Sequence, residues 1–179
     1  MTNQPPATYL AFGSNLGNRE ANIRMAIGRL TPLVRVDAVS SLYETPPMGV
    51  EDQPAFLNAV ARVTTGLTPH ALLRYVKALE DEIGRRPGPR WGPRPIDIDI
   101  LLMGDRVVDT DALTLPHPHL AERAFVLVPL AELAPDLVPA GQADTIAKLA
   151  ASIDSAGVTK VAEPDWERRG RGSWLERRP

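Results

Sequence analysis

The chain has 179 residues, of which 44% are hydrophobic, so its length and composition suit one domain with an ordinary buried core. The formal net charge of −2 gives no basic field for nucleic-acid binding, and the absence of cysteine excludes disulfides and thiolate metal sites. Because no apolar run approaches the roughly 20 residues that span a membrane, and the N-terminus lacks the basic-then-apolar pattern of a signal peptide, we expect a soluble, cytoplasmic protein.

The first half of the chain predicts alternating strands and helices after a flexible tail over residues 1–7. The first helix has apolar residues at helical spacing, and Asn18 can cap it. The second helix is the clearest, because Thr68 can cap it, Pro69 suits its first turn and Gly84 ends it. The predicted elements of this half are strands over 8–15, 34–45 and 55–65 and helices over 18–30 and 68–84, with 13–15 as a strand-to-helix turn.

The second half begins with a loop rich in arginine, proline and glycine, which leads into a strand over 96–103. The later elements are expected to be a short strand within 104–110, a loop over 113–119, and helices over about 120–133 and 144–153. Residues 163–179 are rich in arginine and glycine, and we expect them to form a flexible C-terminal tail, with a docking role for Trp166 or Trp174 as the alternative.

The order β-α-β-β-α-β is typical of the ferredoxin-like α+β fold, with further helices following at the C-terminus. In that fold both helices of the core pack on one face of an antiparallel sheet. The other face is then left for a ligand and the loops.

The predicted strand over 96–103 carries two acids. Asp97 and Asp99 are two residues apart, so both side chains point to one face while the isoleucines beside them point to the core. Two such carboxylates, about 7 Å apart along a strand, repel each other. Magnesium is the natural cation between them, because it prefers oxygen ligands and often joins carboxylates to phosphates. The pair could also lie on a solvated sheet face, or pair with Arg94 and Arg106.

The neighbouring sequence favours the phosphate interpretation, because guanidinium groups match phosphate oxygens. The cationic candidates are Arg85, Arg86, Arg90 and Arg94 in the preceding loop, with His117 and Arg123 further along the chain. Acids for a metal and arginines for phosphate are typical of a nucleotide-dependent transferase. The chain has no G-x-x-x-x-G-K-[ST] motif, so it is not a P-loop enzyme.

The segments "RWGPRPIDIDILL" and "LPHPHLAERAFVLVPLAELAP" resemble the signature of the 6-hydroxymethyl-7,8-dihydropterin pyrophosphokinase family. "AFGSNLG", "YETPPMG" and "DQPAFLNAV" agree with that family in the same order, and the resemblance covers about residues 8–160. It implies a ferredoxin-like domain, here 8–162, that transfers the terminal diphosphate of ATP to the pterin hydroxymethyl group in folate biosynthesis and releases AMP. It also implies two magnesium ions, ATP as co-substrate and a monomer.

The resemblance further implies roles for individual residues. Asp97 and Asp99 match the metal ligands. The residues that match catalytic or ATP-binding positions are Glu80, Arg85 or Arg86, Arg94, His117 and Arg123. The loop "RRPGPR" is shorter than in relatives, so the resemblance leaves open which of Arg85 and Arg86 acts from it.

The pterin site follows partly from chemistry. Phe56 and Asn58 share a face of their strand, and a flat polar heterocycle needs an aromatic surface to stack on and an amide for its ring edge. Phe125 could supply the opposite wall and Trp91 a lid, while ordinary core packing is the alternative for the phenylalanines. The family positions that close the pocket match Thr45, Pro46 and Met48.

Other classes of function stay open. One alternative is a non-enzymatic ferredoxin-like module that binds RNA or a small ligand. An RNA-binding module would show exposed aromatic residues and a basic face, whereas this sheet carries acids. Another nucleotide-dependent transferase, without pterin specificity, would be distinguished by the effect of changing Asn58. His117 and His119 could suggest zinc, but no cysteine or clear third ligand accompanies them.

Overall fold

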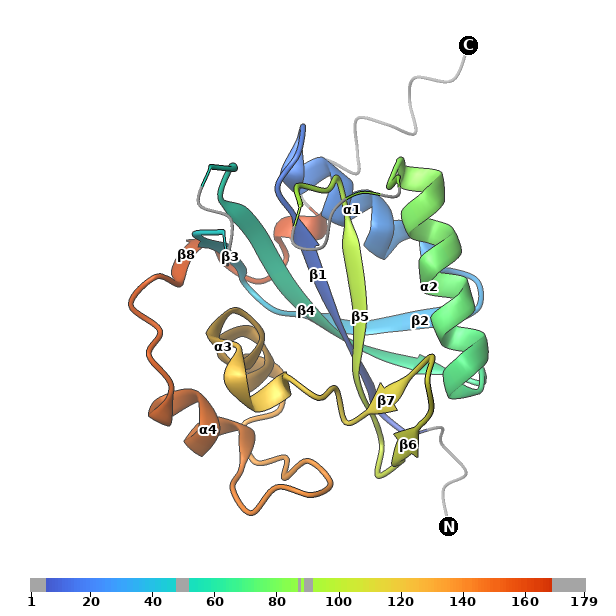
Figure 1. Cartoon of the computed structure of the whole chain (residues 1–179), viewed down its shortest axis with the longest axis vertical. Coiled ribbons are helices and arrows are strands. Elements are labelled where there is room, and N and C mark those ends of the chain that lie inside the picture. The colour runs from blue at the N-terminus through green and yellow to red at the C-terminus, as the bar shows by residue number, and fades with distance from the viewer. Residues whose placement is uncertain (1–5, 48–51, 87, 89–91, 169–179) are drawn as a thin grey trace.

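The computed structural model describes residues 6–47, 52–86, 88 and 92–168, which form a six-stranded antiparallel sheet with helices on both faces (Figure 1). The strands of this sheet are β1 (Thr8–Ser14), β2 (Val34–Val39), β3 (Leu42–Thr45), β4 (Phe56–Thr65), β5 (Asp97–Met103) and β8 (Thr159–Ala162). A separate pair consists of β6 (Val108–Asp109) and β7 (Thr114–Leu115). The helices are α1 (Arg19–Arg29), α2 (Pro69–Ile83), α3 (Ala124–Leu133) and α4 (Ile146–Ser152), with 3₁₀ turns η1 (Leu120–Glu122) and η2 (Trp166–Arg168).

The strand order is β5-β1-β4-β3-β8, and β2 also pairs with β4. This is the order of a ferredoxin-like core, so the predicted fold class is confirmed. The strand predicted over 34–45 is divided into β2 and β3, because the chain departs from regular pairing at Ser40 and Ser41. The Ser41 N–H donates to Glu132 Oε2 at 2.7 Å instead of to a neighbouring strand.

Capping residues fix α1 and α2 close to their predicted positions. Asn18 accepts a hydrogen bond from a first-turn N–H at 3.1 Å, and α1 begins at the next residue. Thr68 accepts likewise at 3.3 Å, Pro69 occupies the first position of α2, and Gly84 follows its end with a left-handed φ of 107°. The local sequence signals at these helix ends are therefore confirmed.

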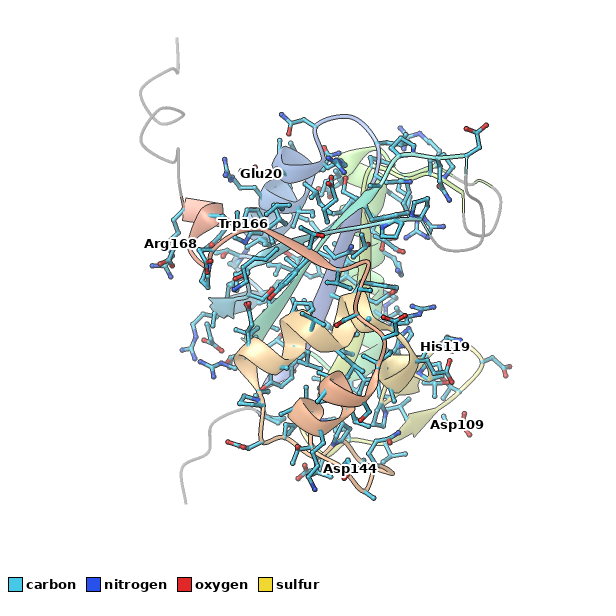
Figure 2. The ribbon with its side chains drawn as sticks, turned by 90° about the vertical axis from the view of Figure 1, so that its left-hand side faces the viewer. Glu20, Asp109, His119, Asp144, Trp166 and Arg168 are labelled. Atoms are coloured by element: carbon cyan, nitrogen blue, oxygen red, sulfur yellow. The ribbon has the colours of Figure 1, made fainter. Side chains whose placement is uncertain are left out.

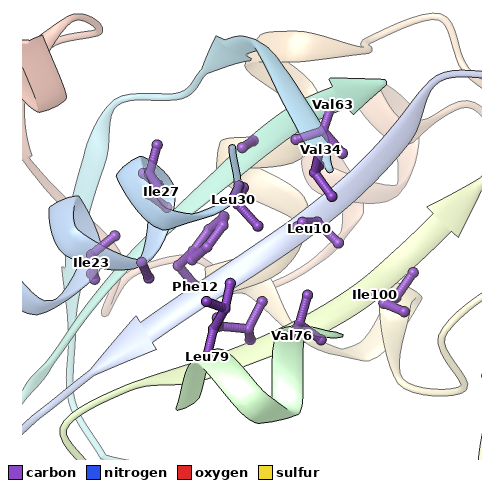
Figure 3. Packing of buried hydrophobic residues seen from close by; sticks show 14 of the residues in the cluster. Leu10, Phe12, Ile23, Ile27, Leu30, Val34, Val63, Val76, Leu79 and Ile100 are labelled. Carbon is purple, nitrogen blue, oxygen red and sulfur yellow. The ribbon is translucent and has the colours of Figure 1, made fainter. Parts of the chain in front are cut away.

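The main core lies between the sheet and these two helices. Leu10 and Phe12 of β1 are 0% and 1% exposed. Figure 3 shows Ile27 of α1 and Leu79 of α2 on either side of Phe12. Because burying one such side chain contributes about 1.5–3 kcal/mol, this layer holds both helices on the sheet and determines where the end of α2 meets β5.

Helices also cover part of the second sheet face. Tyr9, Val60 and Leu102 point to that side, and Leu127 and Leu130 of α3 pack with them in a second apolar cluster. α4 packs against α3 in turn. A helix as apolar all round as α3 needs burial on more than one side. The expectation that this face is left wholly to a ligand and loops is therefore wrong.

The helix predicted over 120–133 is two elements. η1 ends at Glu122 and α3 begins at Ala124, and Arg123 between them has an extended backbone with φ −118° and ψ 104°. Apolar residues continue on both sides of the break, so the sequence pattern gives no sign of it.

In the described part of the chain, no helix has the length and apolar character needed to cross a membrane.

The C-terminal segment packs on the domain. Trp166 is 1% exposed, belongs to the main core and donates its indole N–H to the Ser40 carbonyl at 3.0 Å. Figure 2 shows it beside α1, near Glu20, where Arg24 Nη2 donates to the Trp166 carbonyl at 2.8 Å. The expectation of a flexible tail is therefore wrong for residues 163–168. The burial of one indole holds this segment on the domain although the residues around it are polar. Residues 169–179 lie outside the described part of the chain.

Short edge elements differ from the prediction. β6 lies in the segment where a short strand is expected, but its partner β7 lies in a predicted loop, and β8 is an unpredicted edge strand beside β3. At the N-terminus, Ala7 accepts a hydrogen bond from the Gly104 N–H at 2.9 Å, so the tail expected over 1–7 ends earlier. Pairings of two to four residues have too short a pattern to be recognised from sequence.

A buried carboxylate fastens the end of α2 to β5. Glu80 is 2% exposed and accepts hydrogen bonds from the Ile98 N–H at 2.6 Å, from Lys77 Nζ at 2.8 Å and from Arg85. Burial raises the pKa of Glu80, although Lys77 and the Ile98 N–H act in the opposite direction. Because the Ile98 N–H belongs to β5, α2 cannot separate from β5 without breaking this buried, charge-assisted hydrogen bond.

Glu80→Ala should lower the free energy of unfolding by about 2–4 kcal/mol, because buried donors lose their acceptor. Glu80→Gln keeps an acceptor for the Ile98 N–H and should lose less. Urea denaturation followed by circular dichroism measures both. Glu82→Ala is the matched control on the same helix, since the Glu82 side chain is 60% exposed and its loss should cost less than about 0.5 kcal/mol. Equal losses at the two positions would contradict the anchoring role of Glu80.

Candidate active site

A cavity of about 440 Å³ opens at one end of β1, β4 and β5, on the sheet face that carries α3. It brings together residues from both halves of the chain. The sequence-predicted site residues that line it are Thr45, Pro46, Phe56, Asn58, Arg85, Arg94, Asp97, Asp99, His117, Arg123 and Phe125.

The floor of the cavity is the backbone of β1. Gly13 pairs with Asn58 of β4 on one side and with Asp97 of β5 on the other. A Cβ added at Gly13 would lie 3.3 Å from Asn58 Oδ1 and 4.0 Å from the Asp97 Cβ. The missing side chain therefore keeps the space between the amide and the carboxylate open. Gly13 lies within β1, so the expectation of a turn at this residue is wrong.

Asp97 is the centre of an ion-pair network at the edge of the cavity. Its Oδ1 accepts from Arg85 Nη1 at 2.6 Å, and its Oδ2 accepts from Arg94 Nη1 at 3.0 Å. Lys77 Nζ lies 4.0 Å from Oδ1. Burial alone would raise the pKa of the Asp97 carboxyl, but Arg85, Lys77 and Arg94 hold it below its usual range. The carboxylate is therefore ionised at neutral pH.

Asp99 faces the same cavity two residues further along β5, as the strand period predicts. Lys77 Nζ lies 3.8 Å from its Oδ1. Two carboxylates on one open face are a donor set that suits a hard cation such as magnesium. Among the described residues, no group of three or more acids, histidines or cysteines could hold a metal ion. The remaining ligands of a metal at this position would therefore come from water or from a bound phosphate.

The two arginines at the end of α2 differ in position. Arg85 bridges Glu80 and Asp97. Burial alone would lower the pKa of the Arg85 guanidinium, but the two acids raise it above its ordinary value. Arg86 Nη1 instead donates to the Asp81 carbonyl at 3.3 Å, away from the cavity. Of these two arginines, Arg85 is therefore the one that reaches the carboxylates.

His117 and Arg123 line the cavity from the segment that leads into α3. Burial lowers the pKa of His117, although Asp99 acts in the opposite direction. The Arg123 guanidinium lies over the Phe125 ring, 5.8 Å from its centroid. His119 also lines the cavity and bonds Glu122 through Nδ1 at 2.8 Å.

Aromatic rings and an amide line the end of the cavity that lies across Gly13 from Asp97. Phe56 and Asn58 both line it from β4, and Phe125 lines it from α3. Asn58 Nδ2 donates to Thr45 Oγ1 at 2.8 Å, which fixes the orientation of the amide. This end therefore offers aromatic rings and an oriented amide, as the sequence predicts.

The predicted set omits two residues that organise the cavity. Asn15, which is 1% exposed, accepts from the Arg94 N–H at 2.8 Å and donates to Gln53 and the Pro54 carbonyl at 3.0 and 3.2 Å. It thereby ties together the segments that follow β3 and precede β5. The positive charge of Lys77 lies within 4.0 Å of the Glu80, Asp97 and Asp99 carboxylates and offsets their mutual repulsion. The helical position of Lys77, three residues before Glu80, was a usable sequence signal, whereas the contacts of Asn15 have none.

The remaining predicted residues do not line the cavity in the described part of the chain. Glu80 supports it from behind through α2, and its contact with ATP stays a prediction. Arg86 points away. Met48 and Trp91, predicted to close the pterin pocket, lie outside the described residues.

Comparison with known proteins agrees with this arrangement. Residues 9–135 match the family model described as 7,8-dihydro-6-hydroxymethylpterin-pyrophosphokinase. The chain is 47% identical over 155 residues to a 2-amino-4-hydroxy-6-hydroxymethyldihydropteridine pyrophosphokinase of Methylorubrum extorquens, covering 86% of this chain and 97% of that protein. It is also 47% identical over 127 residues to the Bacillus subtilis protein of that name, covering 70% of this chain and 76% of that one.

Solved structures agree on the fold. A crystal structure titled as Plasmodium falciparum HPPK-DHPS superposes with a TM-score of 0.68 at 16% identity, covering 83% of this chain and 45% of that chain. At that identity the likeness concerns the fold alone. The family match over residues 9–135 and the high identity to proteins of similar length show that the chain belongs to the 7,8-dihydro-6-hydroxymethylpterin-pyrophosphokinase family.

Proposed function

We propose that this family member transfers diphosphate from ATP to the hydroxymethyl group of 6-hydroxymethyl-7,8-dihydropterin, giving AMP and the pterin diphosphate in folate biosynthesis. One observation carries the proposal. A single cavity has the acids Asp97 and Asp99 with arginines at one end, and Phe56 and Asn58 at the other. The two ends suit the two substrates, a polyphosphate and a flat polar ring.

The pterin end supports recognition by stacking and by an amide. Phe56 and Phe125 would face the two sides of the ring, and Asn58 would hydrogen-bond its polar edge. The bond from Asn58 Nδ2 to Thr45 leaves Oδ1 as the free acceptor for a ring N–H. Gly13 keeps the floor open between Asn58 and Asp97, so the hydroxymethyl group can reach the acids.

The phosphate end supports binding of ATP with two magnesium ions at Asp97 and Asp99. Magnesium, when bound there, supplies positive charge to the phosphate oxygens. Arg85 and Arg94 lie within 3.0 Å of the Asp97 carboxylate, so they can exchange its oxygens for those of phosphate. His117 and Arg123 also line the cavity, where they can contact the other phosphates.

The reaction is an in-line displacement. The hydroxyl oxygen of the pterin forms a bond to the β-phosphorus as the bond from that phosphorus to the oxygen of AMP breaks, and the hydroxyl proton passes to water. The chain contributes by orienting the two substrates and by stabilising charge with Arg85 and Arg94, which can supply most of the catalysis in phosphoryl transfer.

Purified protein with ATP, Mg²⁺ and 6-hydroxymethyl-7,8-dihydropterin should form AMP only when the pterin is present. Asp97→Ala and Asp99→Ala should each lower kcat by about 10²–10⁴-fold, because the charge that gathers the phosphates is lost. Separation of the nucleotide products by anion-exchange chromatography measures both. Asp109→Ala, which changes an exposed acid outside the cavity, is the control and should keep full activity.

Three results would contradict this proposal. ADP in place of AMP would indicate an ordinary kinase on the same scaffold. Unchanged AMP formation in both aspartate variants would remove Asp97 and Asp99 from the site. A folded protein without any turnover would favour a binding module.

Asn58→Ala should raise KM for the pterin by about 10–100-fold, because the ring edge loses its acceptor, and should change KM for ATP by less than about twofold. Arg94→Ala should give the opposite pattern, with the larger change in KM for ATP. Steady-state kinetics with each substrate varied in turn measures both. Equal effects of Asn58→Ala on the two KM values would show that the pterin does not bind beside Asn58.

A further inference from the structure

The last described part of the chain, residues 157–168, lies outside the 9–135 region that matches the family model. We call it the C-terminal buttress. It consists of a turn at Gly157, the edge strand β8, and the segment that carries Trp166 into the main core. Each of these parts contacts β3 or the residues that flank it.

The first contact is the pairing of β8 with β3. Tyr43 and Glu44 of β3 pair with Lys160 and Thr159 of β8. Lys160 Nζ also lies 3.1 Å from Glu132 Oε1. Glu132 in turn accepts from the Tyr43 hydroxyl and from the Ser41 N–H, so one carboxylate of α3 joins β8 to the start of β3.

The second contact is in the core at the start of β3. The Trp166 indole N–H donates to the Ser40 carbonyl at 3.0 Å, and both residues are buried. Ser40 Oγ accepts from the Val60 N–H at 3.0 Å, which ties the same point to β4. Trp166 therefore holds the irregular junction between β2 and β3 against the sheet.

The third contact is at the cavity end of β3. A Cβ added at Gly157 would lie 3.2 Å from both Cδ and Cγ of Pro46, a separation tighter than ordinary van der Waals contact. Pro46 follows directly after β3, and its other side lines the cavity. Gly157 does not line the cavity itself, so Pro46 lies between the two.

These contacts converge on Thr45, the last residue of β3. Thr45 is 5% exposed and accepts the hydrogen bond that orients the Asn58 amide. A shift of β3 or Pro46 would therefore change both the shape of this end of the cavity and the direction of the amide. The cavity end formed by Arg94 and Asp97 has no contact with β8 among the strand pairings of the sheet.

We propose that the C-terminal buttress is a positioning element for the pterin end of the site, and that Gly157 is required there because a side chain would displace Pro46. The inference rests on the proposed function, since it takes the pterin to bind beside Thr45 and Asn58. It assigns a consequence for pterin binding to a segment that does not line the cavity.

Gly157→Ala tests this directly. The variant should raise KM for the pterin by about five- to tenfold, because a displacement well under 1 Å is enough to misplace a bound ring. KM for ATP should change by less than about twofold, since Asp97 and the arginines are held by other contacts. The matched control is Gly66→Ala, because a Cβ at Gly66 would have no atom within 4 Å. Thermal unfolding of both variants verifies that they are folded.

Trp166→Phe gives a second, independent measurement. It keeps an aromatic ring in the core but removes the donor to the Ser40 carbonyl, so it should also raise KM for the pterin more than KM for ATP. Unchanged pterin KM in both Gly157→Ala and Trp166→Phe would overturn the inference. Equal rises in the KM values for pterin and ATP would do so as well, because they would indicate a general loss of structure. Absence of AMP formation by the unaltered protein would instead refute the proposed function.

Discussion

The concentration of acids where α2 meets β5 is the constraint on which the rest of the site depends. Glu80, Asp97 and Asp99 lie together, and three such charges repel unless cations lie among them. Lys77, Arg85 and Arg94 supply that charge. The same acids can hold metal and the same arginines can hold phosphate, so the network that stabilises this part of the fold consists of the groups that we propose act in the reaction.

This network also explains why one sheet can serve two substrates. The register of β1 places Gly13 between Asn58 of β4 and Asp97 of β5, so the amide end and the acid end of the cavity lie on the two strands that flank β1. Asn15, at the end of β1, bonds Arg94 on one side and Gln53 on the other. The acid end is held by α2 and the amide end by β3 and the buttress, so we expect a change at one end to affect that end more than the other.

Much of this could be predicted from sequence, for reasons that differ between residues. Strand period alone puts Asp97 and Asp99 on one face, and capping residues define α2. The choice between Arg85 and Arg86 could not be predicted, because both are adjacent at a helix end and the outcome depends on three-dimensional contacts with Glu80 and Asp97. The polar neighbours of Trp166 favour a flexible tail over a docking role, whereas its burial depends on a contact with Ser40, 126 residues away in the chain.

A crystal structure with Mg²⁺, a non-hydrolysable ATP analogue and the pterin would test the central claim most directly. We expect metal within about 2.0–2.1 Å of oxygens from both Asp97 and Asp99, Arg85 moved from Asp97 to a phosphate oxygen, and the pterin between Phe56 and Phe125 with its edge on Asn58. A nucleotide bound elsewhere, with Arg85 still bridging Glu80 and Asp97 and no metal on either aspartate, would contradict the account.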